Sequence, residues 1–353
     1  MDLRQARSRL ALRGLMAAIC VGLLWAPSLG AQASDKVSAT PAPMVATPAA
    51  TAVAKPAASQ AGTAVPVAHN AAAFWREARQ GSVGITTIKG AETGVLVQSE
   101  GDVWRQIRNG PVTLAGGLLL VLLTISILLF HAWKGQLRMS ARPSGRRLER
   151  FTAIERLVHN TVAGSFVLLA LGGLMLLFGK YVLVPFLGHT LVSLIMQVLK
   201  PVHNFLGLVF LLALLAMIVM WAKDNLWAKI DAEWIRRVGG LIDRTHVPSW
   251  RFNFGEKTWF WFGVTILGLT VAVSGLLLDF PAILELRARL QVANLVHGIG
   301  ALLMMLLALG HIYMGTIGVE GAYQSMKTGE VDEVWARDHH ELWHQQVTSK
   351  GKH

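Results

Sequence analysis

The apolar positions of this 353-residue chain fall into five long blocks that are separated by charged segments. The blocks cover approximately residues 112–133, 159–179, 201–222, 257–280 and 292–318. Each is close to the length of about 20 residues that an α-helix needs to cross the hydrocarbon core of a bilayer. Because backbone polar groups cannot stay unpaired in lipid, these blocks predict transmembrane helices. The segment 181–199, interrupted by Pro185 and Gly188, predicts no further span.

The sequence before the first block consists of three segments that differ in composition. Residues 1–33 combine basic residues, a short apolar stretch and small residues at Ala31 and Ala33, which predicts a secretory signal peptide; an uncleaved anchor helix is the alternative. Residues 34–73 contain almost no large side chains and predict a linker. Residues 74–109 include Trp75, Trp104 and several charged residues, which is enough for a small cap segment. We therefore expect a periplasmic linker and cap at 34–110 and an extra transmembrane helix at 111–134, ahead of a four-helix bundle at 150–320.

The connecting segments differ sharply in their content of Lys and Arg. Segments 134–158 and 223–257 each contain seven such residues, whereas 180–200 and 281–291 contain two each. Positive residues accumulate on the cytoplasmic side of bacterial inner membranes. We therefore expect 134–158, 223–257 and a tail at 321–353 to be cytoplasmic and the N-terminal region to be periplasmic. The chain is thus predicted to be a multi-pass protein of the bacterial inner membrane.

Composition agrees with this class and excludes several chemistries. Hydrophobic residues make up 53% of the chain and charged residues 15%. The net charge of +12 comes from residues beside the apolar blocks, which argues against binding to nucleic acid. The single cysteine, Cys20, falls in the predicted signal peptide. The mature chain would therefore lack disulfides, cysteine-bound iron–sulfur clusters and covalently attached haem.

Four histidines lie within or at the ends of the predicted spans, where an ionisable side chain is costly and marks a functional site. They are His159, His203, His297 and His311. Topology places His203 and His297 toward the periplasmic side, and His159 and His311 toward the cytoplasmic side. The fourteen residues from His297 to His311 correspond to about 1400° of helix rotation, so both rings share one face about 21 Å apart. One helix can thus supply an axial ligand to each of two haem b groups, with two other helices supplying the opposing imidazoles.

Other readings of these residues stay open. Histidines near helix ends are often interfacial, and we interpret His131 and His189 in this way. His246 belongs to a polar loop, while His339, His340 and His344 form a tail cluster that either binds metal or, as we expect, faces solvent. Glycines beside the four histidines, such as Gly172, Gly173, Gly207 and Gly298, fit either close approach of a flat macrocycle or ordinary helix packing.

Short motifs around the histidines carry a resemblance to a known family. They lie at residues 155–159, 202–207, 253–257 and 310–314, with further stretches at 329–331 and 335–340. In order and spacing they resemble the gamma subunit of membrane-bound formate dehydrogenase, a cytochrome b of the family that also serves nickel–iron hydrogenases. The resemblance covers residues 150 to 345. The helix at 112–133 lies outside the shorter members of that family.

The resemblance implies an electron-transfer subunit with two haem b groups, held by the same two histidine pairs. It also implies a quinone site, for menaquinone or ubiquinone, at Asn253 and Gly255 beside the cytoplasmic haem. Glu256 stands where the family pattern has Gln, and either delivers protons to quinone or faces solvent. The implied partners are an iron–sulfur beta subunit and a catalytic alpha subunit containing molybdenum or tungsten, and the chain itself has no catalytic residue.

Two alternatives remain at this point. The same cytochrome could serve a hydrogenase or another molybdoenzyme. In a different class, the chain could be a haem-free membrane anchor or assembly protein in which the histidines only pack.

Overall fold

The computed structural model describes residues 100–240 and 247–350, together with Arg76, Gln80 and the short stretches 82–83 and 92–97. The predicted signal peptide, the predicted linker at 34–73 and His246 lie outside the described residues. Within the cap region, β1 (Ser82–Val83) and β2 (Val95–Val97) form an antiparallel pair.

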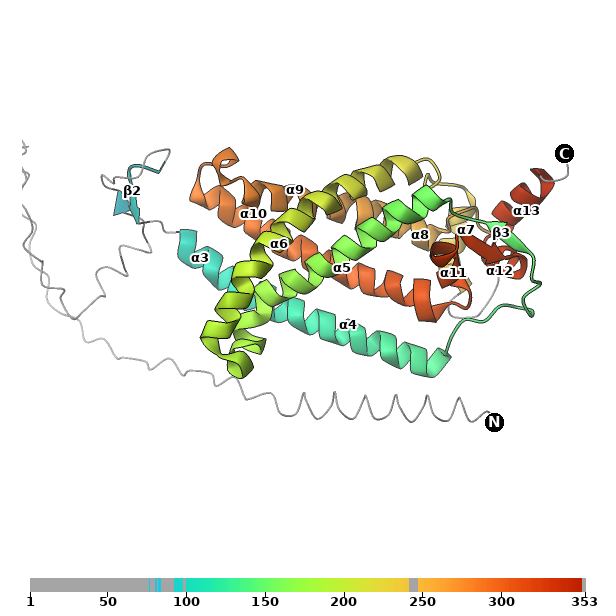
Figure 1. Ribbon diagram of the computed structural model, residues 1–353, viewed down its shortest axis with the longest axis horizontal. Coiled ribbons are helices and arrows are strands. Elements are labelled where there is room, and N and C mark those ends of the chain that lie inside the picture. Colours follow the sequence, from blue (N-terminus) through green and yellow to red (C-terminus); the bar gives the residue numbers. More distant parts are fainter. Residues whose placement is uncertain are drawn as a thin grey trace, which may run out of the picture. The chain divides into compact units, whose positions relative to one another are not determined.

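The described residues contain five helices that are long and apolar enough to cross a membrane, as the sequence predicted (Figure 1). Three of them change helix type along their length but remain continuous. In chain order, the elements are α3 (Glu100–Ile107), η1 (Arg108–Val112) and α4 (Thr113–Lys134); α5 (Ala153–Val182); α6 (Val184–Trp221); α8 (Phe254–Thr258), η3 (Trp259–Leu267) and α9 (Gly268–Asp279); and α10 (Arg287–Tyr313) with η5 (Met314–Gly318). The prediction of an all-α membrane protein is confirmed.

The third span begins earlier than the sequence suggested. Residues 184–200 are helical and belong to α6, although the backbone of Gly188 has φ 72° and ψ 168°, which kinks the helix there. A non-glycine residue rarely adopts this positive φ. Pro201 therefore lies inside the helix instead of at its start; it lacks the N–H that would bond to the preceding turn, a defect that membrane helices tolerate.

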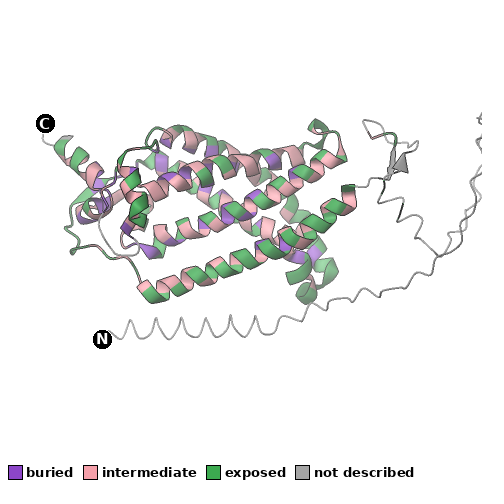
Figure 2. Cartoon of the chain, turned by 180° about the vertical axis from the view of Figure 1, so that it is seen from behind, coloured by how far each residue is buried: buried purple, intermediate pink, exposed green. Residues whose placement is uncertain are grey.

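Within the spans, buried residues lie at the contacts between helices, and the outer faces are apolar and exposed (Figure 2). The interior cluster includes Phe210, Leu214, Phe260 and Met304. α4 is the most peripheral span, with 11% of its most apolar window buried. Exposed apolar surface of this extent would aggregate in water but suits contact with lipid chains. The chain is thus a multi-pass membrane protein.

The segments predicted to be cytoplasmic meet at one end of the helices (Figure 1). β3 (Arg147–Glu149) pairs antiparallel with β4 (Glu330–Asp332), which joins the segment after α4 to the tail. The remaining short elements are α7 (Ile230–Arg236), η2 (Val238–Gly240), α11 (Ala322–Lys327), α12 (Glu333–His339) and α13 (Glu341–Lys350) at this end and η4 (Pro281–Ile283) after α9. Their common location agrees with a shared side of the membrane, while the identity of that side stays a prediction.

Two helices start at this end with reciprocal capping boxes. Thr152 and Glu155 cap α5, and Asn253 and Glu256 cap α8. In each box the polar N-cap side chain accepts from the third helical N–H and the glutamate accepts from the N-cap N–H, which satisfies two otherwise unpaired donors.

Two arginines cross-link these boxes. Arg150 donates to Glu256 Oε1 at 2.9 Å and to the carbonyl of Arg251 at 2.9 Å. Arg251 donates to Glu155 Oε1 at 2.7 Å and to the carbonyl of Arg150 at 2.7 Å. We call these four residues the arginine exchange. Because the Arg150 side chain is only 4% exposed, its pairing with Glu256 is required to offset the cost of burying the charge.

The expectation that the tail histidines face solvent is wrong for His340. Its residue exposure is 1%, and its Nδ1 lies 2.7 Å from the carbonyl oxygen of Trp250. The loop that carries Trp250 is ninety residues away in sequence, so no local pattern could reveal this burial. His344 instead contacts Glu333 at 3.1 Å. No group of three or more metal-binding side chains converges within the described residues.

Burial of His340 makes the tail sensitive to pH. Burial, with the positive charge of Arg150 nearby, lowers the pKa of His340 to about 3 from an ordinary value of 6.5. A folded-state pKa below the unfolded value means that the unfolded tail binds the proton first as pH falls. Stability is therefore complete above pH 6.5 and decreases between pH 6.5 and 3.

We predict that hydrogen-exchange protection of α12 decreases by up to tenfold between pH 6 and pH 5, after correction for intrinsic exchange rates. In His340→Gln, which cannot titrate, protection should be independent of pH over this interval. If the hydrogen-exchange protection of α12 in the unaltered protein stayed constant from pH 6 to pH 5, this role for His340 would be contradicted.

Candidate functional site

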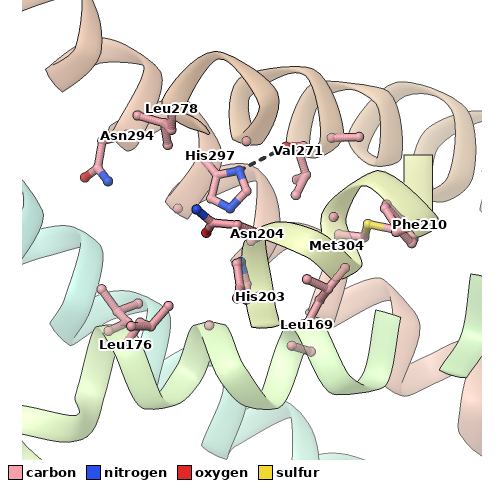
Figure 3. Close-up of a pocket in the computed structure, with 18 of the residues that line it drawn as sticks. Leu169, Leu176, His203, Asn204, Phe210, Val271, Leu278, Asn294, His297 and Met304 are labelled. Carbon is pink, nitrogen blue, oxygen red and sulfur yellow. Dashed lines mark hydrogen bonds between the residues drawn. The ribbon is translucent and has the colours of Figure 1, made fainter. Parts of the chain in front are cut away.

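The structure brings His203 of α6 and His297 of α10 together. Their ring centroids are 6.2 Å apart and the ring planes are inclined at 78°. Figure 3 shows the two rings close to one another, one from each helix. Both residues are half-buried. Two imidazoles from different helices thus share one region within the bundle.

The hydrogen bonds of His297 determine which ring nitrogen is available. Its Nδ1 lies 2.9 Å from the carbonyl oxygen of Val271 on α9, the bond drawn in Figure 3, and 3.3 Å from Ser274 Oγ. A carbonyl oxygen only accepts, so Nδ1 carries the proton in the neutral ring. The lone pair is then on Nε2, which is the arrangement found in metal-binding histidines whose other ring nitrogen donates to a carbonyl or carboxylate oxygen.

Glycines allow neighbouring helices to approach both rings. A Cβ at Gly172 or Gly173 of α5 would lie 3.3 Å or 3.6 Å from the His203 ring, and one at Gly275 of α9 would lie 3.0 Å from Cε1 of His297. The Nδ1 of His203 is buried and makes no hydrogen bond within the described residues. Sequence reasoning identified Gly172 and Gly173 but missed Gly275, because it lies far from any histidine in the sequence.

His159 of α5 and His311 of α10 form the second pair. Their ring centroids are 6.4 Å apart, with the planes inclined at 57°. Trp259 stacks on His311 with a centroid distance of 5.0 Å and a 16° inclination. The two pairs therefore lie at different levels of α10, and each takes its second ring from a different helix.

Trp259 owes its position to an irregular helix. It is the first residue of η3, a nine-residue π-helical stretch, and its ring occupies the place where a Cβ of Gly263 would be. Wider π turns change the direction of side chains and are frequent at functional sites. Apolar patterning does not signal this change of helix type, so Trp259 was not among the candidate residues.

Both ring separations match the spacing of two imidazoles on one metal ion. A bond from an imidazole nitrogen to a metal is about 2 Å long, and the nitrogen lies roughly 1 Å from the ring centre, so opposing rings have centroids about 6 Å apart. Each pair offers two imidazoles, which is the number a haem iron takes when protein fills both axial positions. The donor set therefore fits haem at each pair.

A cavity of about 370 Å³ adjoins His203 and His297. Its size falls in the range of about 300–1,000 Å³ that is typical of cofactor sites. Most of its wall is apolar and comes from α5, α6, α9 and α10, including Leu169, Phe210 and Met304 (Figure 3). Such a wall suits the apolar body of a macrocycle.

Asn253 and Gly255 lie at the start of α8, where both make structural contacts. Asn253 Oδ1 accepts from the N–H of Glu256 at 3.0 Å, and a Cβ at Gly255 would lie 3.0 Å from the Trp234 ring. Both carboxylate oxygens of Glu256 are engaged, one by Arg150 and the other by the N–H of Asn253 at 2.9 Å. Glu256 thus joins the arginine exchange, and its side chain is 33% exposed.

Comparison with known proteins identifies the family. A model of the prokaryotic cytochrome b561 family matches residues 150–329, just over half of the chain. The chain belongs to the prokaryotic cytochrome b561 family. Its members bind haem b, so membership favours a cytochrome over a haem-free anchor.

The relatives of this cytochrome b561 family member include membrane subunits of formate dehydrogenases. It is 28% identical over 202 residues to the cytochrome b556(fdo) subunit of formate dehydrogenase from Escherichia coli (strain K12), covering 56% of this chain and 92% of the relative. It is 25% identical over 208 residues to the nitrate-inducible cytochrome b556(Fdn) subunit of the same organism, covering 57% and 92%. The resemblance inferred from the short motifs is therefore confirmed. The helix formed by α3, η1 and α4 precedes the residues matched by the family model.

We predict that Gly275→Val displaces the His297 ring and alters the haem absorption spectrum, because an added side chain would meet that ring directly. Gly315→Ala is the matched control, since nothing lies within 4 Å of the added Cβ. Spectra of the two purified variants, compared at equal protein concentration, check this expectation. A normal spectrum in Gly275→Val would show that the contact does not position His297.

Proposed function

We propose that this chain is the di-haem cytochrome b subunit of a respiratory formate dehydrogenase complex, which it anchors in the inner membrane while passing electrons to quinone. The relatives whose names include formate dehydrogenase support the choice of complex. The observation that carries the proposal is the distance between the two rings within each histidine pair. The ring centroids are 6.2 Å apart in the pair of His203 and His297 and 6.4 Å apart in the pair of His159 and His311.

In this proposal His203 and His297 hold one haem b, and His159 and His311 hold the other. When bound, these groups would supply reversible one-electron redox chemistry. The hydrogen bond from His297 Nδ1 to Val271 keeps Nε2 directed to the metal, and the stacked ring of Trp259 restricts rotation of His311. The apolar walls exclude water from the pair at His203.

The excess of Lys and Arg in 134–158 and 223–257 supports placing the pair at His159 on the cytoplasmic side. Quinone would then bind near the start of α8, close to Asn253 and Gly255. Glu256 interacts electrostatically with His311, so the charged start of α8 lies at the same end of the bundle as the pair of His159 and His311. Protons for quinone would enter from the cytoplasm.

The partners in this proposal occupy the opposite side. An iron–sulfur subunit would deliver electrons near His203 and His297, and a molybdenum- or tungsten-containing subunit would oxidise formate. The transfer of charge across the membrane would contribute about 2.3 kcal/mol per charge for each 100 mV of membrane potential.

A hydrogenase or another molybdoenzyme is the second candidate for the complex, because the family resemblance includes hydrogenase cytochromes. The site geometry serves both candidates equally well. Co-purification distinguishes them: a formate-oxidising partner supports the proposal, and a hydrogen-oxidising partner contradicts it.

Replacement of single histidines tests the ligand assignment. We predict that His159→Ala, His203→Ala, His297→Ala and His311→Ala each lose or disturb one haem, because each removes one of two axial nitrogens. The haem content per chain, together with the reduced absorption spectrum, provides the measurement.

His131→Ala and His189→Ala are the controls and should keep both haems. His131 makes a 3.3 Å contact from Nδ1 to the Tyr313 hydroxyl and His189 is exposed, so neither belongs to a facing pair. Two normal haems in His311→Ala would refute the assignment of the second pair.

A further inference from the structure

Part of the wall of the cavity at His203 and His297 comes from residues that lie outside the region matched by the family model. Arg108 and Val112, both from η1, line it together with residues of α5, α6, α9 and α10. These two residues precede the matched region, which starts at residue 150. The helix made of α3, η1 and α4 therefore completes the site.

Apart from the two histidines and Asn204, the polar residues of the cavity wall belong to one end of it. Lys200 precedes His203 by three residues on α6, Asn294 precedes His297 by three residues on α10, and Asp279 is the last residue of α9. Given the directions of these helices, all three lie away from the β3–β4 end. Arg108 joins them where α3 passes into η1. This end of the cavity contains two cations and one carboxylate.

Lys200 and Arg108 differ in their charged neighbours. Lys200 interacts electrostatically with Asp279. The contacts of Arg108 in the described part of the chain are a 3.0 Å hydrogen bond from Nη1 to Asn109 Oδ1 and the ring of Trp104, 5.9 Å from its guanidinium carbon. Neither of these partners carries a charge. A guanidinium has five N–H donors in a planar fork that fits a carboxylate, so Arg108 retains capacity for an anionic ligand.

Local structure holds the backbone of Arg108 in place. Its carbonyl oxygen accepts from the Thr113 hydroxyl at 2.6 Å and also from the Thr113 N–H. Pro111 lies inside this π turn and donates no backbone hydrogen bond. The turn thus fixes the position of Arg108 at the cavity wall while the chain continues into α4.

We infer that Arg108 binds a carboxylate group of the prosthetic group held between His203 and His297, an inference that rests on the proposed function. Haem b has two propionate carboxylates, and the polar end of the cavity combines Arg108 with Lys200. A carboxylate paired with a guanidinium in a partly buried site is held more firmly than one left in lipid or water. The additional helix is therefore part of the haem site as well as of the membrane anchor.

The test uses the full-length protein purified in detergent, with Arg108→Gln and Arg108→Lys as variants. Arg105→Gln is the matched control, because Arg105 belongs to the same helix, is exposed and pairs with Asp102 at 2.7 Å. Two properties are measured for each protein: the rate of haem transfer to apomyoglobin and the midpoint potential of each haem as a function of pH.

We expect Arg108→Gln to release one of the two haems about tenfold faster, which corresponds to about 1.4 kcal/mol. The midpoint potential of that haem should decrease, because loss of the cation disfavours the reduced, less positive iron. Its pH dependence should move to higher pH, because the carboxylate loses the charge that favours ionisation. Arg108→Lys should restore the potential in part, and Arg105→Gln should match the unaltered protein.

Equal release rates and potentials in Arg108→Gln and the unaltered protein would overturn the inference while leaving the proposed function intact. An unaltered protein that contains no haem would overturn the proposed function itself. A snorkelling role for Arg108 at lipid phosphate groups predicts differences that appear only in vesicles with anionic lipid, and that outcome also overturns the inference.

Discussion

A bilayer offers no water to the nitrogens of an imidazole ring, so four histidines inside one bundle need partners supplied by the protein or by a ligand. The structure meets this need by arranging the rings in two facing pairs. α10 contributes one ring to each pair, and α5 and α6 contribute the others. The spacing within each pair leaves room for a metal ion between nitrogens, and the proposed electron transfer depends on that spacing.

Polar contacts join α5 and α6, which carry two of these rings, to the start of α8 at one end of the bundle. The arginine exchange joins the starts of α5 and α8 through ion pairs and carbonyl oxygens. Trp221, near the end of α6, donates from Nε1 to Glu155 at 2.9 Å, which adds a third helix to the same network. Because His159 lies one turn after Glu155, this network also determines the height of one imidazole in the bundle.

Periodicity and charge in the sequence were sufficient to predict the five spans and the histidines that lie at equal depth. They were insufficient for contacts made between distant segments. Gly275 lies against His297 because α9 and α10 pack together, and Trp259 reaches His311 through a π-helical register that apolar patterning does not encode. His340 is buried by a loop from elsewhere in the chain. The start of α6 was misplaced because Pro201 is compatible with a helix interior when neighbouring helices cover the defect.

The helix before the matched bundle is part of the site, since η1 contributes to the wall of the cavity beside His203. The central claim is that each histidine pair holds one haem iron through two imidazole nitrogens. Haem quantitation combined with electron paramagnetic resonance of the oxidised, unaltered protein tests this claim most directly. The account predicts two haem b groups per chain, both low-spin with two imidazole ligands. A single haem per chain, or a stoichiometric high-spin haem with one axial ligand, would contradict it.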